Sequence, residues 1–159
     1  MHYIGHNDHD PTIEDIYHTN IEIDGKYHKL EIPDTAGEDD YQNFLNEWIR
    51  FADGFILVFG IDDDYECFEN MKNKYNRIRK LGKEKNPMIL VGNMKNLKEK
   101  DRKVTIDKAQ QFAKSLGIEY IEICSETGYN IPEVFKNIAK KILKFKEKSI
   151  EKRKKCIIV

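Results

Sequence analysis

Two short polar segments of this 159-residue chain have the residue types of a phosphate and metal site. Asp34-Thr35-Ala36-Gly37 lies about twenty residues after Asp10-Pro11-Thr12-Ile13-Glu14-Asp15. Carboxylate oxygens are hard ligands that suit Mg²⁺, and a glycine lets the backbone approach a phosphate without a Cβ in the way. The chain contains no Gly-x-x-x-x-Gly-Lys-Ser/Thr loop, whose N–H groups and lysine supply most of the positive charge around bound phosphates. The pattern therefore predicts only part of a phosphate site.

The bulk composition indicates a globular chain of one domain. Apolar residues make up 40% and charged residues 35% of the sequence, with a net charge of −1. Residues 144–155 hold seven basic and two acidic residues, so the remaining chain carries −6. This acidic body argues against nucleic-acid binding. The three cysteines form no CxxC pair, which indicates a reducing, cytosolic compartment.

The pattern of apolar residues predicts an α/β fold. An alternating strand over 16–23 and its antiparallel partner over 27–32 flank Asp24-Gly25, a strong hairpin signal. The continuous apolar runs 54–59 and 88–91 are typical of strands buried on both faces of a parallel sheet, and 119–124 makes a last strand. Helices are expected over 40–51, 65–81, 106–116 and 132–150, with Thr105 as N-cap and Gly117 after the end of the third.

From Asp10 to about Phe145 the chain resembles the Ras subfamily of small GTPases. The match includes the two segments above, a base-recognition segment at 91–96 and a C-terminal lipidation box, in the right order. The resemblance implies a P-loop NTPase-like fold, with a mostly parallel sheet, one antiparallel hairpin and helices on both faces. It divides the chain into a truncated GTPase domain, 1–145, and a basic tail, 146–159.

Counterparts of the family's first strand, phosphate loop and first helix are missing. The missing strand is normally central, so its loss would leave two unpaired inner edges in the sheet. We expect a longer natural protein that contains these elements; the alternative is a natural protein that lacks them.

The resemblance implies GTP or GDP and Mg²⁺ as cofactors. Thr12 matches the threonine that binds Mg²⁺ and the γ-phosphate, Asp34 the acid that holds Mg²⁺ through water, and Gly37 the glycine that contacts the γ-phosphate. Glu38 stands where most of the family has a glutamine that orients the attacking water. An ionised carboxylate only accepts hydrogen bonds, so we expect slow or absent hydrolysis. The alternative interpretation is an ordinary exposed glutamate at a helix start.

The base-recognition residues also depart from the family. Asn93 is retained, but Met94 replaces the lysine that stacks on the base, and Asn96 replaces the acid that accepts two guanine N–H groups. The amide of Asn96 offers one acceptor and one donor, a mismatch that should cost about 1–3 kcal/mol against guanine and would suit xanthine. Ser125 is the small residue whose N–H could reach the base carbonyl.

The effector surface resembles that of the family more closely. The acidic loop 9–17 beside the first predicted strand matches the surface on which Ras-like proteins receive Ras-binding domains, by β-augmentation and charge complementarity. The implied partners are such effectors, exchange factors and GTPase-activating proteins. The expected effector residues are Ile13, Glu14, Asp15, Ile16 and Tyr17.

The C-terminus predicts a lipid anchor. Cys156-Ile157-Ile158-Val159 fits a prenylation box that does not separate farnesyl from geranylgeranyl, and the basic run 152–155 precedes it. One lipid chain binds membranes reversibly, so the cations provide the second signal. We expect a cytosolic protein that moves, once lipidated at Cys156, to the cytoplasmic face of the plasma membrane.

The family resemblance and the departures from it leave two possible functions. The first is a membrane-anchored, guanine-nucleotide-dependent switch with weak or absent hydrolysis. The alternative is a pseudo-GTPase, a nucleotide-independent interaction scaffold at the membrane. Cys124-Ser125-Glu126 stands where the family has Ser-Ala-Lys. The altered residues Glu38, Met94, Asn96 and Glu126 favour the scaffold, because a missing N-terminus does not explain them.

Overall fold

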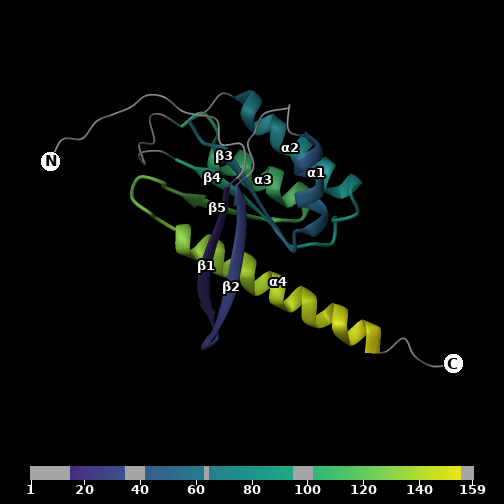
Figure 1. Cartoon of the computed structure of the whole chain (residues 1–159). Helices are drawn as coiled ribbons and strands as arrows, with labels where there is room; N and C mark the ends of the chain where they lie inside the picture. The colour runs from purple at the N-terminus through teal and green to yellow at the C-terminus, as the bar shows by residue number, and fades with distance from the viewer. Residues whose placement is uncertain (1–14, 35–41, 63–64, 95–101, 155–159) are drawn as a thin grey trace. The chain divides into compact units, whose positions relative to one another are not determined.

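The computed structural model describes residues 15–34, 42–62, 65–94 and 102–154 (Figure 1). The chain divides into two compact units, Met1–Trp48 and Ile49–Val159. Among the described residues, the antiparallel hairpin and the parallel strands form two separate sheets.

The first unit contains the predicted hairpin. Strand β1 (Asp15–Ile23) pairs with β2 (Lys26–Asp34), from Ile23 opposite Lys26 at the turn to Asp15 opposite Asp34 at the open end. Asp24 and Gly25 both have positive φ, 50° and 76°. Two left-handed residues give a turn whose twist matches that of the flanking strands, so the Asp-Gly signal is confirmed.

The second unit is built on a parallel sheet of order β3-β4-β5, and helix α1 crosses the boundary between the units. Continuous apolar runs form the first two of these strands, as expected. The elements are α1 (Gln42–Phe51), β3 (Phe55–Gly60), α2 (Tyr65–Lys80), β4 (Met88–Asn93), α3 (Ile106–Leu116), β5 (Glu119–Ile123) and α4 (Ile131–Lys154).

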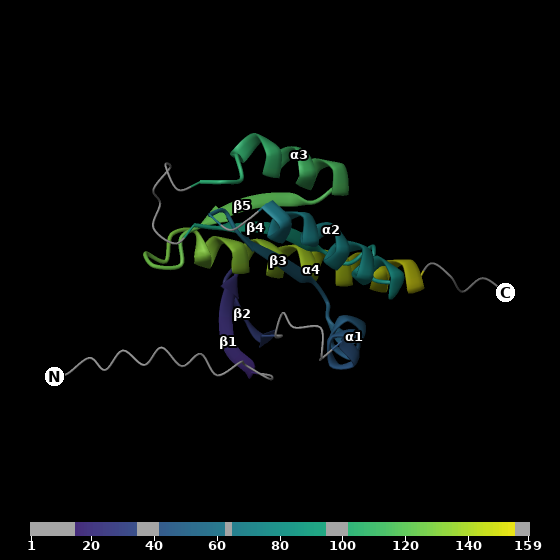
Figure 2. The same cartoon turned by 90° about the horizontal axis from the view of Figure 1, so that it is seen from above.

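Helices cover both faces of this parallel sheet, which confirms the prediction. Figure 2 shows α3 and α4 on opposite sides of β4 and β5. On the α4 side, Ile89 and Val91 of β4 pack with Val134 and Ile138. On the other side, aromatic rings join the sheet to α2 and α3: Phe68 makes edge contacts of 4.9 Å between ring centroids with both Phe59 and Phe112.

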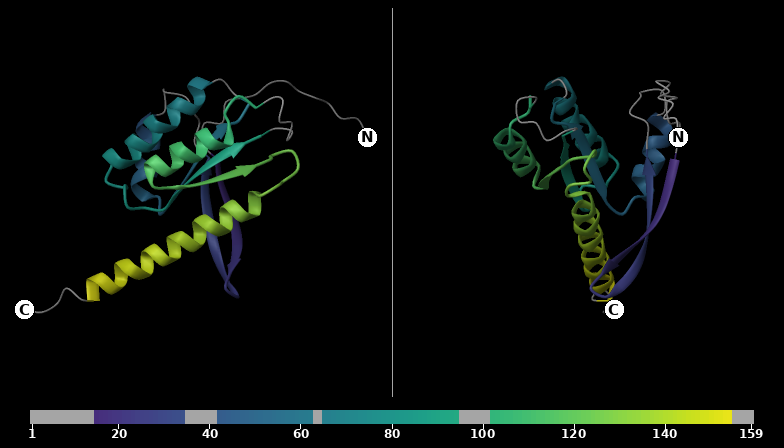
Figure 3. Two further views of the ribbon diagram at one scale, coloured as in Figure 1. Left: turned by 180° about the vertical axis from the view of Figure 1, so that it is seen from behind. Right: turned by 90° about the vertical axis from the view of Figure 1, so that its left-hand side faces the viewer.

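The ends of α3 follow the sequence, whereas α4 is longer than expected. The Thr105 side chain accepts a hydrogen bond from the N–H of Lys108, and Gly117 adopts φ 69° at the C-terminal end. Helix α4 runs to Lys154, past its predicted end at 150 and past the predicted start of the tail at 146 (Figure 3). Lysine, glutamate and arginine are good helix formers and no glycine or proline interrupts them, so the helix continues into the basic segment. No helix in the described ranges combines the length and the apolar character needed to cross a bilayer.

Candidate functional site

Part of the predicted site lies outside the described residues. The hairpin nevertheless brings two of its segments together, because Asp15 at the start of β1 pairs with Asp34 at the end of β2. Thr12 and Gly37 each lie three residues beyond this pair in the sequence. The predicted residues that fall outside the described ranges are Thr12, Ile13, Glu14, Gly37, Glu38, Asn96 and Cys156.

Two of the residues predicted for base recognition, Asn93 and Ser125, meet at one edge of the parallel sheet. Asn93 is the last residue of β4, and Ser125 follows the end of β5 at Ile123. The Ser125 N–H donates a hydrogen bond of 3.1 Å to Asn93 Oδ1. Ligands of open α/β sheets bind at the carboxyl ends of the strands, which is where these two residues lie. The structure therefore brings Asn93 and Ser125 together at this edge.

Hydrogen bonds within the protein already engage this edge. The Met94 N–H donates to the Ile123 carbonyl at 2.9 Å, and the Met94 side chain is only 3% exposed. The Ile61 N–H donates to the Asn93 carbonyl at 2.9 Å, which extends the β3–β4 ladder. The Ser125 N–H, expected from the sequence to reach a base carbonyl, donates to Asn93 instead. A bound base would have to share or displace that hydrogen bond.

A partly buried charged network supports the same edge. Arg102 Nη1 and Nη2 donate hydrogen bonds of 2.9 Å to Glu122 Oε1 and Oε2, and Tyr120 Oη donates one of 2.7 Å to Glu122 Oε1. The side chains of Arg102 and Glu122 are 7% and 24% exposed. Burial raises the pKa of Glu122, but hydrogen bonds from Arg102 and Tyr120 outweigh it and hold that pKa below the ordinary value. Burial, and then the hydrogen bond with Glu122, raise the pKa of Tyr120.

This network anchors the end of the segment that contains Asn96. Arg102 follows residues 95–101 directly, and the N–H groups of Lys103 and Val104 both donate to the Ile61 carbonyl, at 3.0 and 3.1 Å. The start of the segment is held through Met94. The residues on both sides of 95–101 are therefore attached to the sheet.

Sequence reasoning missed the Arg102–Glu122 pair. One signal was available: Glu122 stands between Ile121 and Ile123 in β5, and Tyr120 shares its face. Alternate residues of a strand point to opposite faces. An acid flanked by isoleucines that pack against α4 must therefore face the other covered side of the sheet, where it needs a partner.

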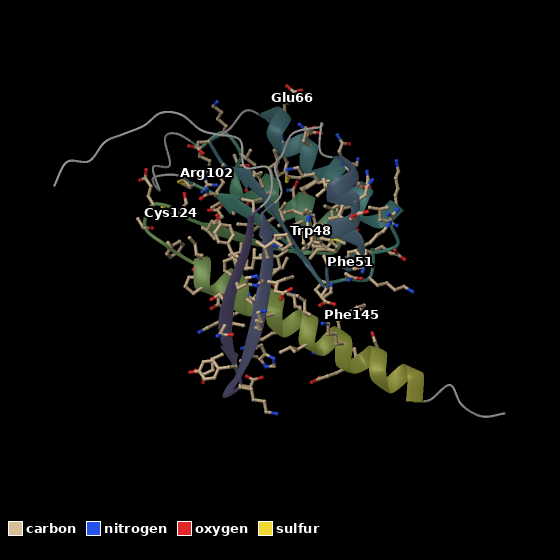
Figure 4. The ribbon with its side chains drawn as sticks, viewed as in Figure 1. Trp48, Phe51, Glu66, Arg102, Cys124 and Phe145 are labelled. Carbon is tan, nitrogen blue, oxygen red and sulfur yellow. The ribbon has the colours of Figure 1, made fainter. Side chains whose placement is uncertain are left out.

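The turn that carries Ser125 is also well supported. The Gly128 N–H donates to the Cys124 carbonyl at 2.9 Å, and the Cys124 N–H donates to the Tyr129 carbonyl at 3.2 Å. Asn130 has φ 59°, and its Nδ2 donates to the Glu122 carbonyl at 2.9 Å. Figure 4 shows Arg102 and Cys124 toward the same end of the second unit. The Arg102–Glu122 network and the turn that carries Ser125 therefore support the same edge of the parallel sheet.

The described part of the expected effector surface lies on β1. Ile16 and Tyr17 are 44% and 55% exposed. Within residues 15–34, β1 pairs with β2 along one edge only. Such a strand can accept an added strand from a partner.

Comparison with known proteins agrees with these observations. The model of the Ras family matches residues 4–144. The chain is 36% identical over 138 residues to the Ras-like protein rasU of Dictyostelium discoideum, which covers 87% of the chain and 64% of rasU. It is 33% identical over 159 residues to the Ras-like protein RAS2 of Hydra vulgaris, which covers 96% of the chain and 82% of RAS2.

The chain thus spans less than two thirds of the length of rasU. The family match extends over most of the chain, including the hairpin and the parallel sheet with its Asn93–Ser125 edge. From these matches, the chain belongs to the Ras family of small GTPases.

Proposed function

We propose that this chain acts as a membrane-anchored Ras-like signalling switch that binds guanine nucleotide and Mg²⁺ with impaired affinity and hydrolysis. The observation that carries the proposal is the hydrogen bond between Ser125 N–H and Asn93 Oδ1. It brings two residues that the sequence predicts for base recognition to the carboxyl edge of the sheet, where ligands of open α/β sheets bind. Asn93 Oδ1 accepts from Ser125 N–H, so Asn93 Nδ2 is the side-chain group at this edge that could donate to a purine base.

The altered residues account for the impairment. Asn96 presents a donor where guanine needs a second acceptor, and Met94 is buried and offers no charge. Glu38 would bring negative charge toward the phosphates and cannot donate a hydrogen bond when ionised. The Mg²⁺ ion would be held by Thr12 and Asp34, with Gly37 beside the γ-phosphate, as the family resemblance implies.

A nucleotide titration tests the proposal. Fluorescent GDP and XDP are titrated, with Mg²⁺, into the full chain and into Asn96→Asp, which restores the second acceptor. We expect weak binding that favours XDP in the unchanged chain, and a gain for GDP of roughly tenfold in Asn96→Asp. Asn76→Ala, an exposed change on α2, is the matched control. Tight and selective GDP binding by the unchanged chain would show the inference from Asn96 to be wrong.

The scaffold alternative has an observation of its own in favour. Ser125 N–H and Met94 N–H are already paired within the protein, so the edge is satisfied without a base. In that case the exposed Ile16 and Tyr17 of β1 would bind a Ras-binding-type domain equally well with GDP, GTP or no nucleotide. Capture of such a domain only in the GTP-loaded state would reject the scaffold.

The anchor is tested separately. Prenylation at Cys156, aided by the basic run 152–155, would hold the protein at the cytoplasmic face of the plasma membrane. We expect Cys156→Ser to move the protein to the cytosolic fraction. A variant that stays on membranes would refute prenylation as the main tether.

A further inference from the structure

A cavity of about 360 Å³ lies at the opposite end of the parallel sheet from Asn93. Strand β4 begins at Met88 and ends at Asn93, and Met88 lines the cavity. Phe145 of α4 forms part of the wall, and Figure 4 shows it well away from Arg102 and Cys124. The remaining apolar lining comes from Pro87, Leu116 and Ile118.

The cavity is rimmed by more positive than negative charge. Lys141, Lys144 and Lys148 line it from α4, together with Phe145. Successive lysines of this set are three and four residues apart, so the three lysine side chains lie along one face of the helix. Lys85 adds a cation from the segment before β4.

The acidic residues at the cavity only partly offset these cations. Glu119 forms an ion pair of 3.1 Å with Lys141, and Glu84 is the other acid of the lining. Among the described residues, no acidic partner is found for Lys144 or Lys148. Two ammonium groups beside an apolar wall are therefore available to an anionic ligand.

Hydrogen bonds hold the walls of the cavity in place. Tyr75 Oη donates to the Leu116 carbonyl at 3.1 Å, which ties α2 to the end of α3. Asn86 Nδ2 donates to the carbonyls of Ala52 and Asp53, each at 3.2 Å. The cavity is thus largely formed before a ligand arrives, as binding sites usually are.

We propose that this cavity binds the headgroup of an anionic phospholipid, with Lys144 and Lys148 on its phosphate and Phe145 beside the glycerol and first acyl carbons. The proposal rests on the membrane anchoring proposed above and names its lipid contact. Helix α4 favours a membrane over an acidic peptide, because it runs from the cavity into the basic segment 152–155. Long lysine side chains can lay their stems on apolar surface and their charges at phosphates. The Asn93 edge would then face away from the bilayer.

Vesicle binding by the full, unlipidated chain provides the first test. Lys144→Ala/Lys148→Ala is compared with Lys136→Ala/Lys140→Ala, which removes two exposed lysines at the same spacing on the same helix but outside the cavity. On phosphatidylserine-rich vesicles at about 0.1 M salt, we expect the cavity variant to lose roughly tenfold to thirtyfold in affinity. The control should lose at most about threefold. Equal losses in the two variants would overturn the proposal.

Methyl NMR with headgroup-spin-labelled phosphatidylserine vesicles provides a second test. We expect the methyl signals of Met88 and Ile118 to broaden more than that of Ile106, although Ile106 on α3 is more exposed than Met88. Broadening that follows exposure instead of the cavity would overturn the proposal. Shifts of Met88 and Ile118 caused by a polyglutamate peptide, without vesicle binding, would assign the cavity to an acidic protein partner and also overturn it.

The two membrane proposals fail separately. If Cys156→Ser leaves membranes in cells while both lysine variants bind vesicles alike, the anchor stands and the cavity proposal is wrong. If the cavity variant alone loses vesicle binding while Cys156→Ser stays on membranes, the cavity proposal stands and prenylation is not the tether.

Discussion

Arg102 and Glu122 meet through two parallel hydrogen bonds of 2.9 Å although twenty residues separate them in the chain. Bidentate arginine–carboxylate pairs of this kind are stronger than single neutral hydrogen bonds and fix the orientation of both groups. Because Arg102 directly follows residues 95–101, which include Asn96, the pair attaches the chain after that segment to β5. Stability and nucleotide binding should therefore both respond to its loss.

Glu122→Gln should lower the free energy of unfolding by about 2–4 kcal/mol, because the guanidinium of Arg102 would remain buried without its full counter-charge. Glu119→Gln is the matched control on the same strand, where an exposed ion pair contributes about 0–1 kcal/mol. Urea unfolding measures both variants. Equal effects would mean that the buried pair contributes no more than a surface one.

Acid should weaken the fold through the same carboxylate. The pKa of Glu122 is held below the ordinary value of 4.5, so the stabilisation it contributes is present above about pH 4.5. It is lost as the pH falls through the lower pKa of the folded protein. Urea midpoints measured down that range should fall more steeply in the unchanged chain than in Glu122→Gln, and parallel curves would contradict this.

Tyr120→Phe should remove an alkaline loss of stability. The pKa of Tyr120 is raised above its ordinary value of 10.0, so its contribution is present below that pH and is lost as the pH rises beyond it. Urea midpoints of the unchanged chain should fall between about pH 9 and pH 11 more than those of the variant. Tyr129→Phe, at an exposed tyrosine, is the control and should keep the alkaline loss.

Gly92→Ala should destabilise the second unit by about 1–3 kcal/mol, the usual cost of overpacking. A Cβ at position 92 would lie 2.5 Å from Tyr120 Oη and 2.9 Å from Ile61 Cδ1. Combination with Tyr120→Phe should recover part of the loss by removing the nearest atom. A double-mutant cycle by thermal unfolding measures this coupling; strictly additive effects would place the strain elsewhere.

Glu38→Gln should raise single-turnover GTP hydrolysis by roughly tenfold or more, because an amide can both donate to and accept from the attacking water. This prediction comes from the sequence, since Glu38 lies outside the described residues. Glu47→Gln on α1 is the control for a charge change alone. A rate that does not change in Glu38→Gln would favour the scaffold alternative.

Local signals predicted most of the elements. Asp24-Gly25 specified the hairpin, because both residues tolerate positive φ, and Thr105 and Gly117 marked the ends of α3. Apolar runs located β3 and β4, because strands covered on both faces exclude polar residues. The end of α4 was missed because the tail continues helix-forming residues without a stop signal.

The sequence by itself determined the family, the hairpin, the order of strands and helices, and the departures at Glu38, Met94 and Asn96. These follow from residue identity and short-range periodicity, which the chain encodes locally. The tertiary structure alone decided that Ser125 N–H donates to Asn93 and that Arg102 and Glu122 form a partly buried pair. It also decided that lysines of α4 line a cavity near the start of β4 and β5. Such contacts join residues distant in sequence, because packing of whole elements, and not periodicity within one, sets which side chains meet.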